Sequence, residues 1–302
     1  MNRKISAFLY MLLFILPGLS FTPENDQDYP VSPEAKLEKL AGGFLFTEGP
    51  ASDAKGNVYF TDQPNNRILV WTTESNLRTF MEPCGRSNGL YIDRKGYIWA
   101  CAEEKNELWQ IAQDKNVTVV LGQFMGKPFN GPNDLWITSK GGVYFTDPYY
   151  QRSWWDHTTM PQESQCVYFL RPDHKTIIKV ADDLVKPNGI IGTPDGKMLY
   201  VADIGGKKTW SYSINRDGTL SNKLLFCDMG SDGMIIDDKG NLYLTGNGVT
   251  IFDKSGKRIG NIAVPEKWTA NVCFGDPDGK SLFITASNSL YRIRMMVKGT
   301  NR

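Results

Sequence analysis

Short runs that alternate between apolar and polar residues, each bounded by a glycine-containing turn, recur along almost the whole chain. Such alternation is typical of β-strands with one buried face, and helical periodicity is nearly absent. One run, Met198–Ala202, follows a Pro-Asp-Gly turn at 194–196 and an Asn-Gly pair at 188–189. The same arrangement returns at intervals, so we predict a protein built from repeated β units.

The repeated units share a register. In each unit, the residue eight positions before the turn glycine carries a carboxylate or a carboxamide. The turn glycines are Gly56, Gly96, Gly141, Gly196, Gly240 and Gly279, and the matching residues are Glu48, Asn88, Asn133, Asn188, Asp232 and Asn271. We call these six the ring residues. They are 40, 45, 55, 44 and 39 residues apart. A period of about forty in a β-rich sequence predicts a propeller.

Each unit has room for four short antiparallel strands, the usual content of a propeller blade. We therefore predict an all-β fold, a six-bladed β-propeller over residues 35–298. In the first unit the strands are expected at 48–52, 57–61, 67–72 and 77–81.

The last unit is short. It offers strands at 271–275, 281–285 and 290–294 but no fourth strand after them. Residues 35–41, which precede the first unit, can supply that strand. We therefore expect the N-terminal strand to close the ring, which also removes exposed sheet edges.

Alternation along the innermost strands predicts a layered channel, because side chains two residues apart share a face. The residues two positions after the ring residues are Pro50, Leu90, Leu135, Ile190, Met234 and Cys273. We expect them to form an apolar floor beneath the ring. The loop at 147–165 should return to the ring's face. Because it is long and aromatic, we interpret it as a lid or substrate wall, the alternative being an ordinary surface insertion.

The chain of 302 residues has a formal net charge of +1 and no long basic run, so we expect no nucleic-acid partner. Residues 1–20 combine two basic residues, an apolar run and small residues near Ser20, which predicts a signal peptide cleaved there. An uncleaved anchor is the alternative. The polar segment 21–34 is expected to be a flexible leader. We thus predict an exported protein, periplasmic or secreted, without membrane contact after cleavage.

Five cysteines are scattered along the chain, at Cys84, Cys101, Cys166, Cys227 and Cys273. Their number is odd and no spacing suits a metal site. We expect most of them to be small buried hydrophobes and predict no disulfide.

Glu48, Asn133, Asn188 and Asp232 together offer hard oxygen donors and two negative charges. This donor set suits Ca²⁺ first, and Mg²⁺ or Mn²⁺ next. The alternative is a polar ring that lines a water-filled channel.

Several segments together resemble the gluconolactonase, regucalcin and senescence-marker-protein family over about residues 35–295. They are FTEGP (46–50), RSNGL (86–90), GPNDLWI (131–137), YFTDP (144–148), KPNGI (186–190), LYVAD (199–203), SDGMIID (231–237), GNLY (240–243) and NVCFGDPDGKSLFITA (271–286). The resemblance implies a six-bladed propeller, hydrolysis of a small-molecule lactone, and a divalent metal in the channel. Calcium is the first candidate, with Mg²⁺, Mn²⁺ or Zn²⁺ as alternatives.

The resemblance also implies roles for single residues. Glu48, Asn188 and Asp232 match the family's metal ligands, and Asn133 matches a ligand of the related diisopropyl fluorophosphatases and paraoxonases. Substrate contacts carry over onto Arg86 and Asn88. The segment 147–166 departs from the best-known members. Further substrate-binding candidates from the sequence itself are Asn271, in register with the ring, and Tyr149, Trp154 and His157 in the expected lid.

These roles lead to a mechanism in which the metal polarises the lactone carbonyl and stabilises the tetrahedral oxyanion. Asp232 is the candidate catalytic residue that orients and deprotonates the attacking water, and direct attack by a metal-supplied hydroxide is the alternative. We predict a metal-dependent, gluconolactonase-like hydrolase of a sugar-type lactone. The alternatives are a phosphotriesterase or arylesterase on the same metal site, and a non-catalytic ligand-binding propeller.

Overall fold

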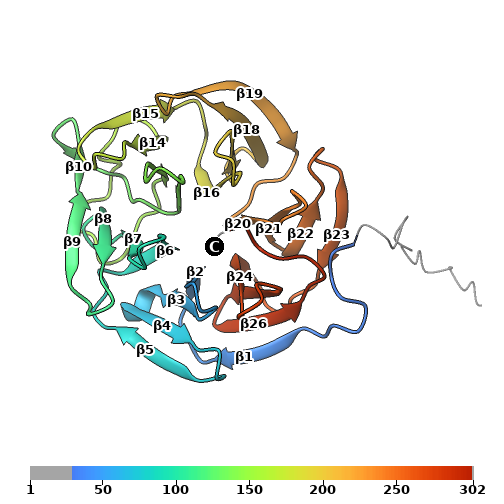
Figure 1. Ribbon diagram of the computed structural model, residues 1–302. Helices are drawn as coiled ribbons and strands as arrows, with labels where there is room; N and C mark the ends of the chain where they lie inside the picture. The colour runs from blue at the N-terminus through green and yellow to red at the C-terminus, as the bar shows by residue number, and fades with distance from the viewer. Residues whose placement is uncertain (1–28, 301–302) are drawn as a thin grey trace, which may run out of the picture.

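The computed structural model describes residues 29–300, and six four-stranded sheets surround a central channel in it (Figure 1). Every pairing within the sheets is antiparallel. The predicted all-β, six-bladed fold is therefore confirmed. Within 29–300 the only helical element is a single 3-10 turn, Gln63–Asn65, and no helix there is long and apolar enough to cross a membrane.

Five blades consist of four consecutive strands, and the innermost strand comes first in the sequence. Blade 1 contains β2 (Thr47–Ser52), β3 (Val58–Asp62), β4 (Arg67–Trp71) and β5 (Leu77–Met81), each within one residue of the prediction. Blade 2 contains β6 (Ser87–Ile92), β7 (Ile98–Ala102), β8 (Glu107–Ile111) and β9 (Val117–Leu121). Blade 3 contains β12 (Leu135–Ile137), β13 (Val143–Asp147), β14 (Cys166–Leu170) and β15 (Ile177–Ala181), after a small hairpin of β10 (Gln123–Phe124) and β11 (Lys127–Pro128).

The remaining blades follow the same order around the ring. Blade 4 contains β16 (Pro187–Gly192), β17 (Met198–Asp203), β18 (Lys208–Ile214) and β19 (Leu220–Cys227). Blade 5 contains β20 (Met234–Ile236), β21 (Leu242–Gly246), β22 (Gly248–Phe252) and β23 (Arg258–Ile262). Blade 6 contains β24 (Thr269–Gly275), β25 (Ser281–Ala286) and β26 (Ser289–Arg294), and its fourth strand is β1 (Glu38–Gly42).

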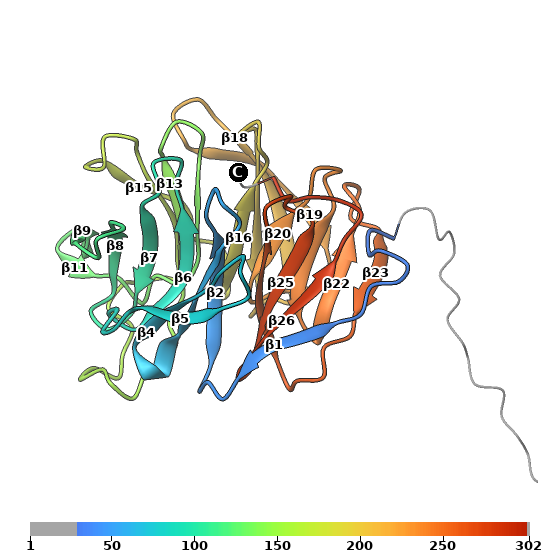
Figure 2. The same cartoon turned by 60° about the horizontal axis from the view of Figure 1, so that its bottom comes forward.

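The strand β1 closes the ring as predicted. It runs antiparallel to β26, with Glu38 opposite Arg292 and Gly42 opposite Ser289, so the two ends of the chain share one blade (Figure 2). The Arg292 guanidinium also donates to the Glu38 carboxylate at 2.9 Å. The strand begins three residues later than the predicted 35–41, because the backbone N–H of Ala35 donates to the Ser32 carbonyl in a turn.

The end of the expected leader is attached to the propeller. Val31 forms an antiparallel bridge with Met295, the Met296 N–H donates to the Pro30 carbonyl, and the Tyr29 hydroxyl donates to the Asn261 carbonyl. The predicted flexible leader over 21–34 therefore does not extend through residues 29–34, since Tyr29 and Val31 pack against the hydrophobic core. The predicted signal peptide and the rest of the leader lie outside the described residues.

Aspartates at the ends of second strands position the ring. In three blades this carboxylate accepts the backbone N–H groups two and three residues before the ring residue, which fixes how the chain enters the innermost strand. Asp62 binds Leu45 and Phe46 at 3.0 and 3.3 Å, Asp147 binds Gly131 and Asn130 at 2.8 and 3.0 Å, and Asp203 binds Lys186 and Val185 at 2.8 and 3.0 Å.

Neighbouring blades approach closely just below the ring. Gly49 has φ of +47°, and a Cβ at this position would lie 2.1 Å from the Asn88 carbonyl oxygen. Only glycine tolerates both the left-handed backbone and this contact. The glycine after the ring residue therefore lets adjacent innermost strands meet around a narrow channel.

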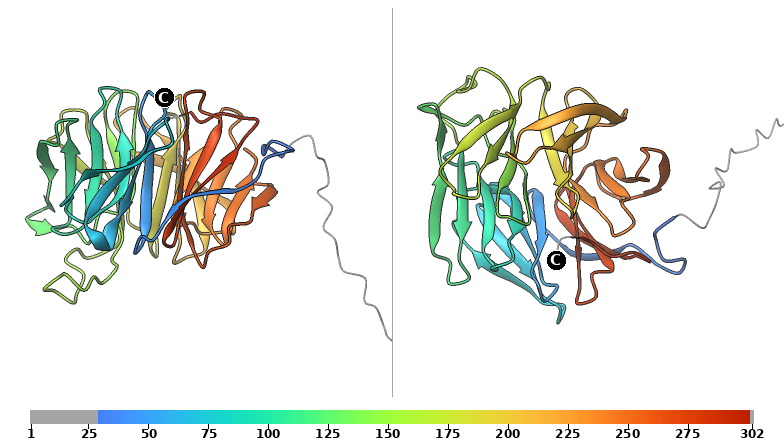
Figure 3. Two further views of the ribbon diagram at one scale, coloured as in Figure 1. Left: turned by 90° about the horizontal axis from the view of Figure 1, so that it is seen from below. Right: turned by 45° about the horizontal axis from the view of Figure 1, so that its top comes forward.

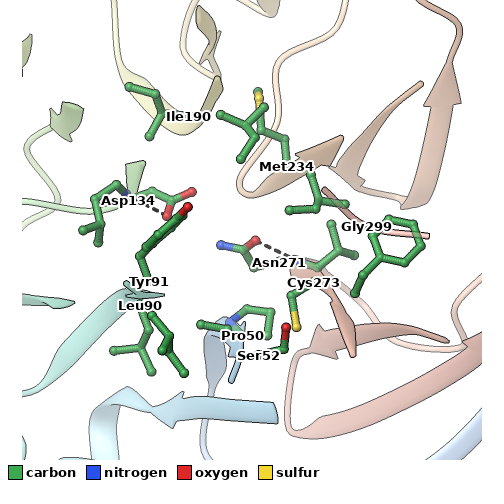
Figure 4. A pocket seen from close by; sticks show the side chains of 17 residues that line it. Pro50, Ser52, Leu90, Tyr91, Asp134, Ile190, Met234, Asn271, Cys273 and Gly299 are labelled. Atoms are coloured by element: carbon green, nitrogen blue, oxygen red, sulfur yellow. Dashed lines mark hydrogen bonds between the residues drawn. The ribbon is translucent and has the colours of Figure 1, made fainter. Parts of the chain in front are cut away.

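The predicted apolar floor is present. All six floor residues line a cavity of about 50 Å³ inside the channel (Figure 4). Leu90, Leu135, Ile190, Met234 and Cys273 are at most 5% exposed. All five cysteines are buried, as expected from the sequence.

The two faces of the disc differ. The long loop 148–165 between β13 and β14, coloured yellow-green, projects from one face, and the C-terminal segment lies on the other (Figure 3, left). There Gly299 bridges to Asp237, and its N–H donates to the Gly279 carbonyl at 3.1 Å. We call these the upper and the lower face. The loop 148–165 is referred to below as the lid loop.

Candidate active site

The four ring residues proposed as metal ligands lie at the upper mouth of the channel, where Asp232 contacts Asn188 and repels Glu48, and Asn133 holds the same register on blade 3. Glu48, Asn133 and Asn188 are at most 5% exposed, and Asp232 is half-buried. The Asn188 amide nitrogen donates to Asp232 Oδ1 at 2.8 Å and to the Tyr150 hydroxyl at 3.0 Å. Its own Oδ1 accepts no hydrogen bond from the described residues, and the Asn133 side chain forms none with them. Both amide oxygens are thus uncommitted.

Burial and mutual repulsion disfavour the ionised forms of the two carboxylates at this end of the channel, Glu48 and Asp232. Burial raises the pKa of Glu48 well above its ordinary value, and repulsion from Asp232 raises it further. Burial also raises the pKa of Asp232 to about 6, although hydrogen bonds from Trp268 and Asn188 oppose the rise. Within 29–300 neither carboxylate forms an ion pair with Lys, Arg or His.

This arrangement fits a hard divalent cation. A positive charge between Glu48 and Asp232 would stabilise both carboxylates, which repel each other, and the two amide oxygens add neutral donors of the kind that Ca²⁺ accepts. The described part of the chain holds no group of three or more His, Cys, Asp or Glu side chains that could bind a metal. Any site here therefore depends on Asn133 and Asn188 as well as on the acids.

The lid loop is fastened to the channel mouth through Glu103, which is 1% exposed. Arg152 Nε and Nη2 donate to the two oxygens of Glu103 at 2.6 and 2.9 Å, and Trp155 Nε1 donates to its backbone carbonyl at 2.7 Å. Together with the contact of Tyr150 on Asn188, these bonds place the lid loop over the ring. The positive charge of Arg152 also lowers the pKa of Asp232, so it lies close to the acid.

The other predicted substrate-binding residues are dispersed. Arg86 stacks on Trp154, with its Cζ 4.5 Å from the ring centre, and donates to the Pro64 carbonyl at 2.8 Å. It therefore supports the lid loop from below. Asn88 donates to Glu103 Oε1 at 2.8 Å, and its own Oδ1 is buried without a partner.

Two predicted lid contacts lie farther from the ring. His157 stacks on Trp155 with 5.0 Å between ring centres, and Tyr149 packs against the same indole at 5.9 Å. The Tyr149 hydroxyl bonds to the Gln151 side chain. These residues form the aromatic body of the lid loop. Asn271 differs from them, because its side chain faces the cavity below the ring (Figure 4), where hydrogen bonds from it lower the pKa of Glu48 and of Asp134.

Comparisons with known proteins identify the family of the chain. Residues 46–288 match the description of the SMP-30/gluconolactonase/LRE-like region. The chain belongs to this family. It is 31% identical to the gluconolactonase of Zymomonas mobilis over 310 residues, covering 92% of this chain and 86% of that protein.

Two further proteins similar to this family member are a gluconolactonase and a lactonase. The structure of a Xanthomonas campestris gluconolactonase superposes with a TM-score of 0.82 at 27% identity, covering 88% of this chain and 91% of that one. Lactonase drp35 of Staphylococcus epidermidis is 24% identical over 315 residues, with 91% of this chain and 88% of that protein covered. The family and these relatives support lactone hydrolysis as the class of reaction.

Four residues of this gluconolactonase-family site escaped the sequence analysis. Glu103 comes directly after the last residue of the second strand of blade 2, where three other blades end this strand with aspartate. An acidic residue at this place in the repeat could therefore have been recognised from the sequence. Arg152 lies within the lid segment. Trp268 Nε1 donates to Asp232 Oδ2 at 2.6 Å, and only the position of its loop before β24 hints at this.

The fourth is Asp134, a carboxylate in the floor. Burial raises the pKa of Asp134 to about 7, while backbone N–H groups of Leu135 and Ile190 oppose the rise. It lines the same cavity as Asn271. Strict alternation would turn residue 134 away from the channel, but β12 begins only at Leu135, so the preceding backbone can turn this side chain inward.

Proposed function

We propose that this chain hydrolyses a sugar-type lactone with the help of a divalent cation, Ca²⁺ in the first place, held by Glu48, Asn133, Asn188 and Asp232. The family membership and the likeness to a gluconolactonase support the reaction class. The observation that carries the metal dependence is that the buried Glu48 and the half-buried Asp232 repel each other, while neither forms an ion pair with a cationic side chain within residues 29–300.

When bound, the cation supplies Lewis-acid polarisation of the lactone carbonyl and a positive charge for the developing oxyanion. Asp232 has two fixed donors, Trp268 and Asn188, which orient its carboxylate at the mouth. In the proposed mechanism this carboxylate positions the attacking water and receives its proton. Glu48 contributes charge and stays turned inward, because its Oε2 accepts the Gly49 N–H at 2.8 Å.

Substrate hydroxyls are proposed to meet the lid side of the mouth. Arg152 uses Nε and Nη2 for Glu103 and forms no hydrogen bond through Nη1 with the described residues, so one guanidinium donor points away from the ion pair. The unpartnered Asn88 Oδ1 is a second polar group at this side. A polyhydroxylated ring offers both donors and acceptors for such groups, as a plain alkyl lactone does not.

The test is a panel of lactones assayed with a pH indicator, before and after treatment with a chelator. We expect hydrolysis of D-glucono-1,5-lactone and related aldonolactones, weaker turnover of unsubstituted δ-valerolactone, and loss of all activity with chelator that Ca²⁺ restores. Phosphotriester and aryl ester arms run in parallel. Faster turnover of either class than of any lactone would overturn the substrate assignment, and full activity in chelator would overturn the metal dependence.

A further inference from the structure

A second hollow lies on the lower face, away from the candidate active site. It has a volume of about 490 Å³ and is lined by the turns that follow the innermost strands of blades 2 and 3. Small-molecule sites typically enclose roughly 300–1,000 Å³. The apolar floor of the channel separates this hollow, which we call the lower groove, from the ring residues. Its size alone is therefore sufficient for an independent small ligand.

The basic and acidic side chains of the lower groove differ in the contacts that they make. Arg94, Lys95 and Lys140 form no ion pair within residues 29–300 and are exposed. The two carboxylates in the lining already accept hydrogen bonds. Asp53 binds the N–H groups of residues 55 and 57 at 2.9 Å, and Asp93 binds those of residues 95 and 97 at 2.9 and 3.0 Å. The three cations thus exceed the two carboxylates of the lining by one charge, and no ion pair within residues 29–300 ties up a cation, whereas both acids are held by hydrogen bonds of their own turns.

Aromatic side chains lie beneath and beside these charges. Trp99 and Trp136 are buried in the lining, and Trp99 Nε1 is held by Asp93 Oδ2 at 3.0 Å, which fixes its ring. The Tyr91 hydroxyl forms no hydrogen bond with the described residues. Burial raises the pKa of Tyr91 to about 12, the charge of Arg94 opposes the rise and that of Asp93 adds to it, so the protonated hydroxyl lies near both charged groups. The buried indoles thus form a fixed apolar base, and the donors around them favour a compact ligand with polar edges.

We propose that the lower groove binds a small organic anion with a sugar-sized polar body, such as a sugar acid or a sugar phosphate. The anionic group would lie against Arg94 and Lys140, with the Tyr91 hydroxyl as an additional donor. Guanidinium and ammonium groups bind carboxylates and phosphates by charge-assisted hydrogen bonds. The groove is not part of the catalytic proposal, and its occupancy does not depend on the cation in the ring.

The test uses the full protein with 5-fluorotryptophan at all eight tryptophans. The fluorine resonances of Trp99 and Trp136 report on the lower groove, and those of Trp154, Trp155 and Trp268 report on the upper mouth; single Trp→Phe variants assign them. Gluconate, glucose 6-phosphate and neutral glucose are titrated separately, up to about 20 mM to cover millimolar dissociation constants. We expect the two anions, but not glucose, to shift Trp99 and Trp136 in a saturable way. The tighter binder identifies carboxylate or phosphate as the preferred group.

Variants separate the groove from the active site. The double variant Arg94→Ala/Lys140→Ala should weaken the anion's affinity by at least about tenfold. Lys239→Ala is the matched control, because Lys239 holds the same turn position before Gly240 in blade 5 and lies outside the groove; its affinity should be unchanged. Asp232→Asn should also leave the Trp99 and Trp136 shifts intact. The proposal is overturned if these resonances do not move, if glucose moves them equally, or if the double variant binds like the unmodified protein.

Discussion

Arg152 of the lid loop and Glu103 of blade 2 form a two-bonded ion pair across 49 residues of sequence, at 2.6 and 2.9 Å. The Glu103 side chain is 1% exposed and that of Arg152 is 22% exposed. Removing one partner of such a pair leaves an uncompensated buried charge, so the effect of a substitution is large. Trp155 adds a further contact of the lid loop to the same residue, because its Nε1 donates to the Glu103 backbone carbonyl.

Arg152→Lys keeps the charge but loses the two-pronged geometry. We expect KM for a lactone substrate to rise by about tenfold, corresponding to roughly 1.4 kcal/mol, with a smaller change in kcat. Steady-state kinetics at saturating Ca²⁺ measure this. The matched control is Arg67→Lys, which alters an Arg–Asp pair at 2.8 Å with a fully buried carboxylate in blade 1. Equal kinetic effects from both variants would show that the lid pair has no special role.

The closing strand should determine the stability of the whole ring. A chain that begins at residue 43 lacks β1, so it exposes the edge of β26 and removes the Glu38–Arg292 contact. We expect its melting temperature to fall by more than about 10 °C relative to a chain that begins at residue 29, because all six blades share one cooperative closure. Differential scanning calorimetry measures the difference. If the truncated protein had the same melting temperature as the chain that begins at residue 29, closure through β1 would be contradicted.

The sequence predicted the blades and the floor because both depend on short-range patterns. Alternation and a period of about forty residues are enough to place β2 and Leu135, since a register error would turn a whole strand face outward. The pairing of β1 with β26 was also predictable, because only one blade lacked a strand and only one segment was left over.

Contacts made by irregular segments were not predictable in this way. Arg152 meets Glu103 through a loop with no repeating pattern, and Trp268 reaches Asp232 from the loop before β24. Such side chains are placed by loop conformation, which alternation does not encode. Asn271 shows the converse limit. It holds the common register, yet its side chain faces the cavity under the ring, because Gly233 next to it leaves no Cβ in the way.

Asp147 should make stability depend on pH. Burial raises the pKa of Asp147 to about 7, although N–H groups of Asn130 and Gly131 oppose the rise, and an unfolded aspartate has a pKa of about 3.9. The folded state therefore binds a proton that the unfolded state has already lost. This contribution to stability is fully present below about pH 4 and is lost as the pH rises through about 7.

Asp147→Asn removes this titration and keeps one oxygen acceptor. We expect the decrease in unfolding free energy between pH 5 and pH 8 to be smaller in the variant by on the order of 2 kcal/mol. Urea unfolding at both pH values, with Ca²⁺ held constant, measures it. The comparison at pH 5 gives the cost of the altered hydrogen bonding alone. An identical pH dependence in both proteins would mean that the Asp147 carboxyl titrates as in an unfolded chain.

The two ring carboxylates should both contribute to Ca²⁺ affinity, but only Asp232 should also act in the hydrolysis step. Glu48→Gln and Asp232→Asn each keep size and remove one negative charge, and a divalent ion held by neutral oxygens binds much more weakly than one held by carboxylates. We therefore expect both variants to lose Ca²⁺ affinity by at least about tenfold, measured by calorimetric titration into chelator-treated protein. Lactone hydrolysis should fall with it.

High Ca²⁺ should then distinguish the two residues. Glu48 is turned inward onto Gly49, so its loss affects only the hold on the ion, and saturating Ca²⁺ should restore most of the activity of Glu48→Gln. Asp232 is fixed at the mouth by Trp268, and its variant should remain slow even when loaded, because the water has lost its acceptor. Asn271→Ala serves as the control, since Asn271 is in register with the ring but carries no charge and is not assigned as a ligand; losing its hydrogen bond to Glu48 should leave Ca²⁺ affinity nearly intact. Undiminished Ca²⁺ affinity in both carboxylate variants would remove the basis for a cation at this site, and with it the proposed mechanism.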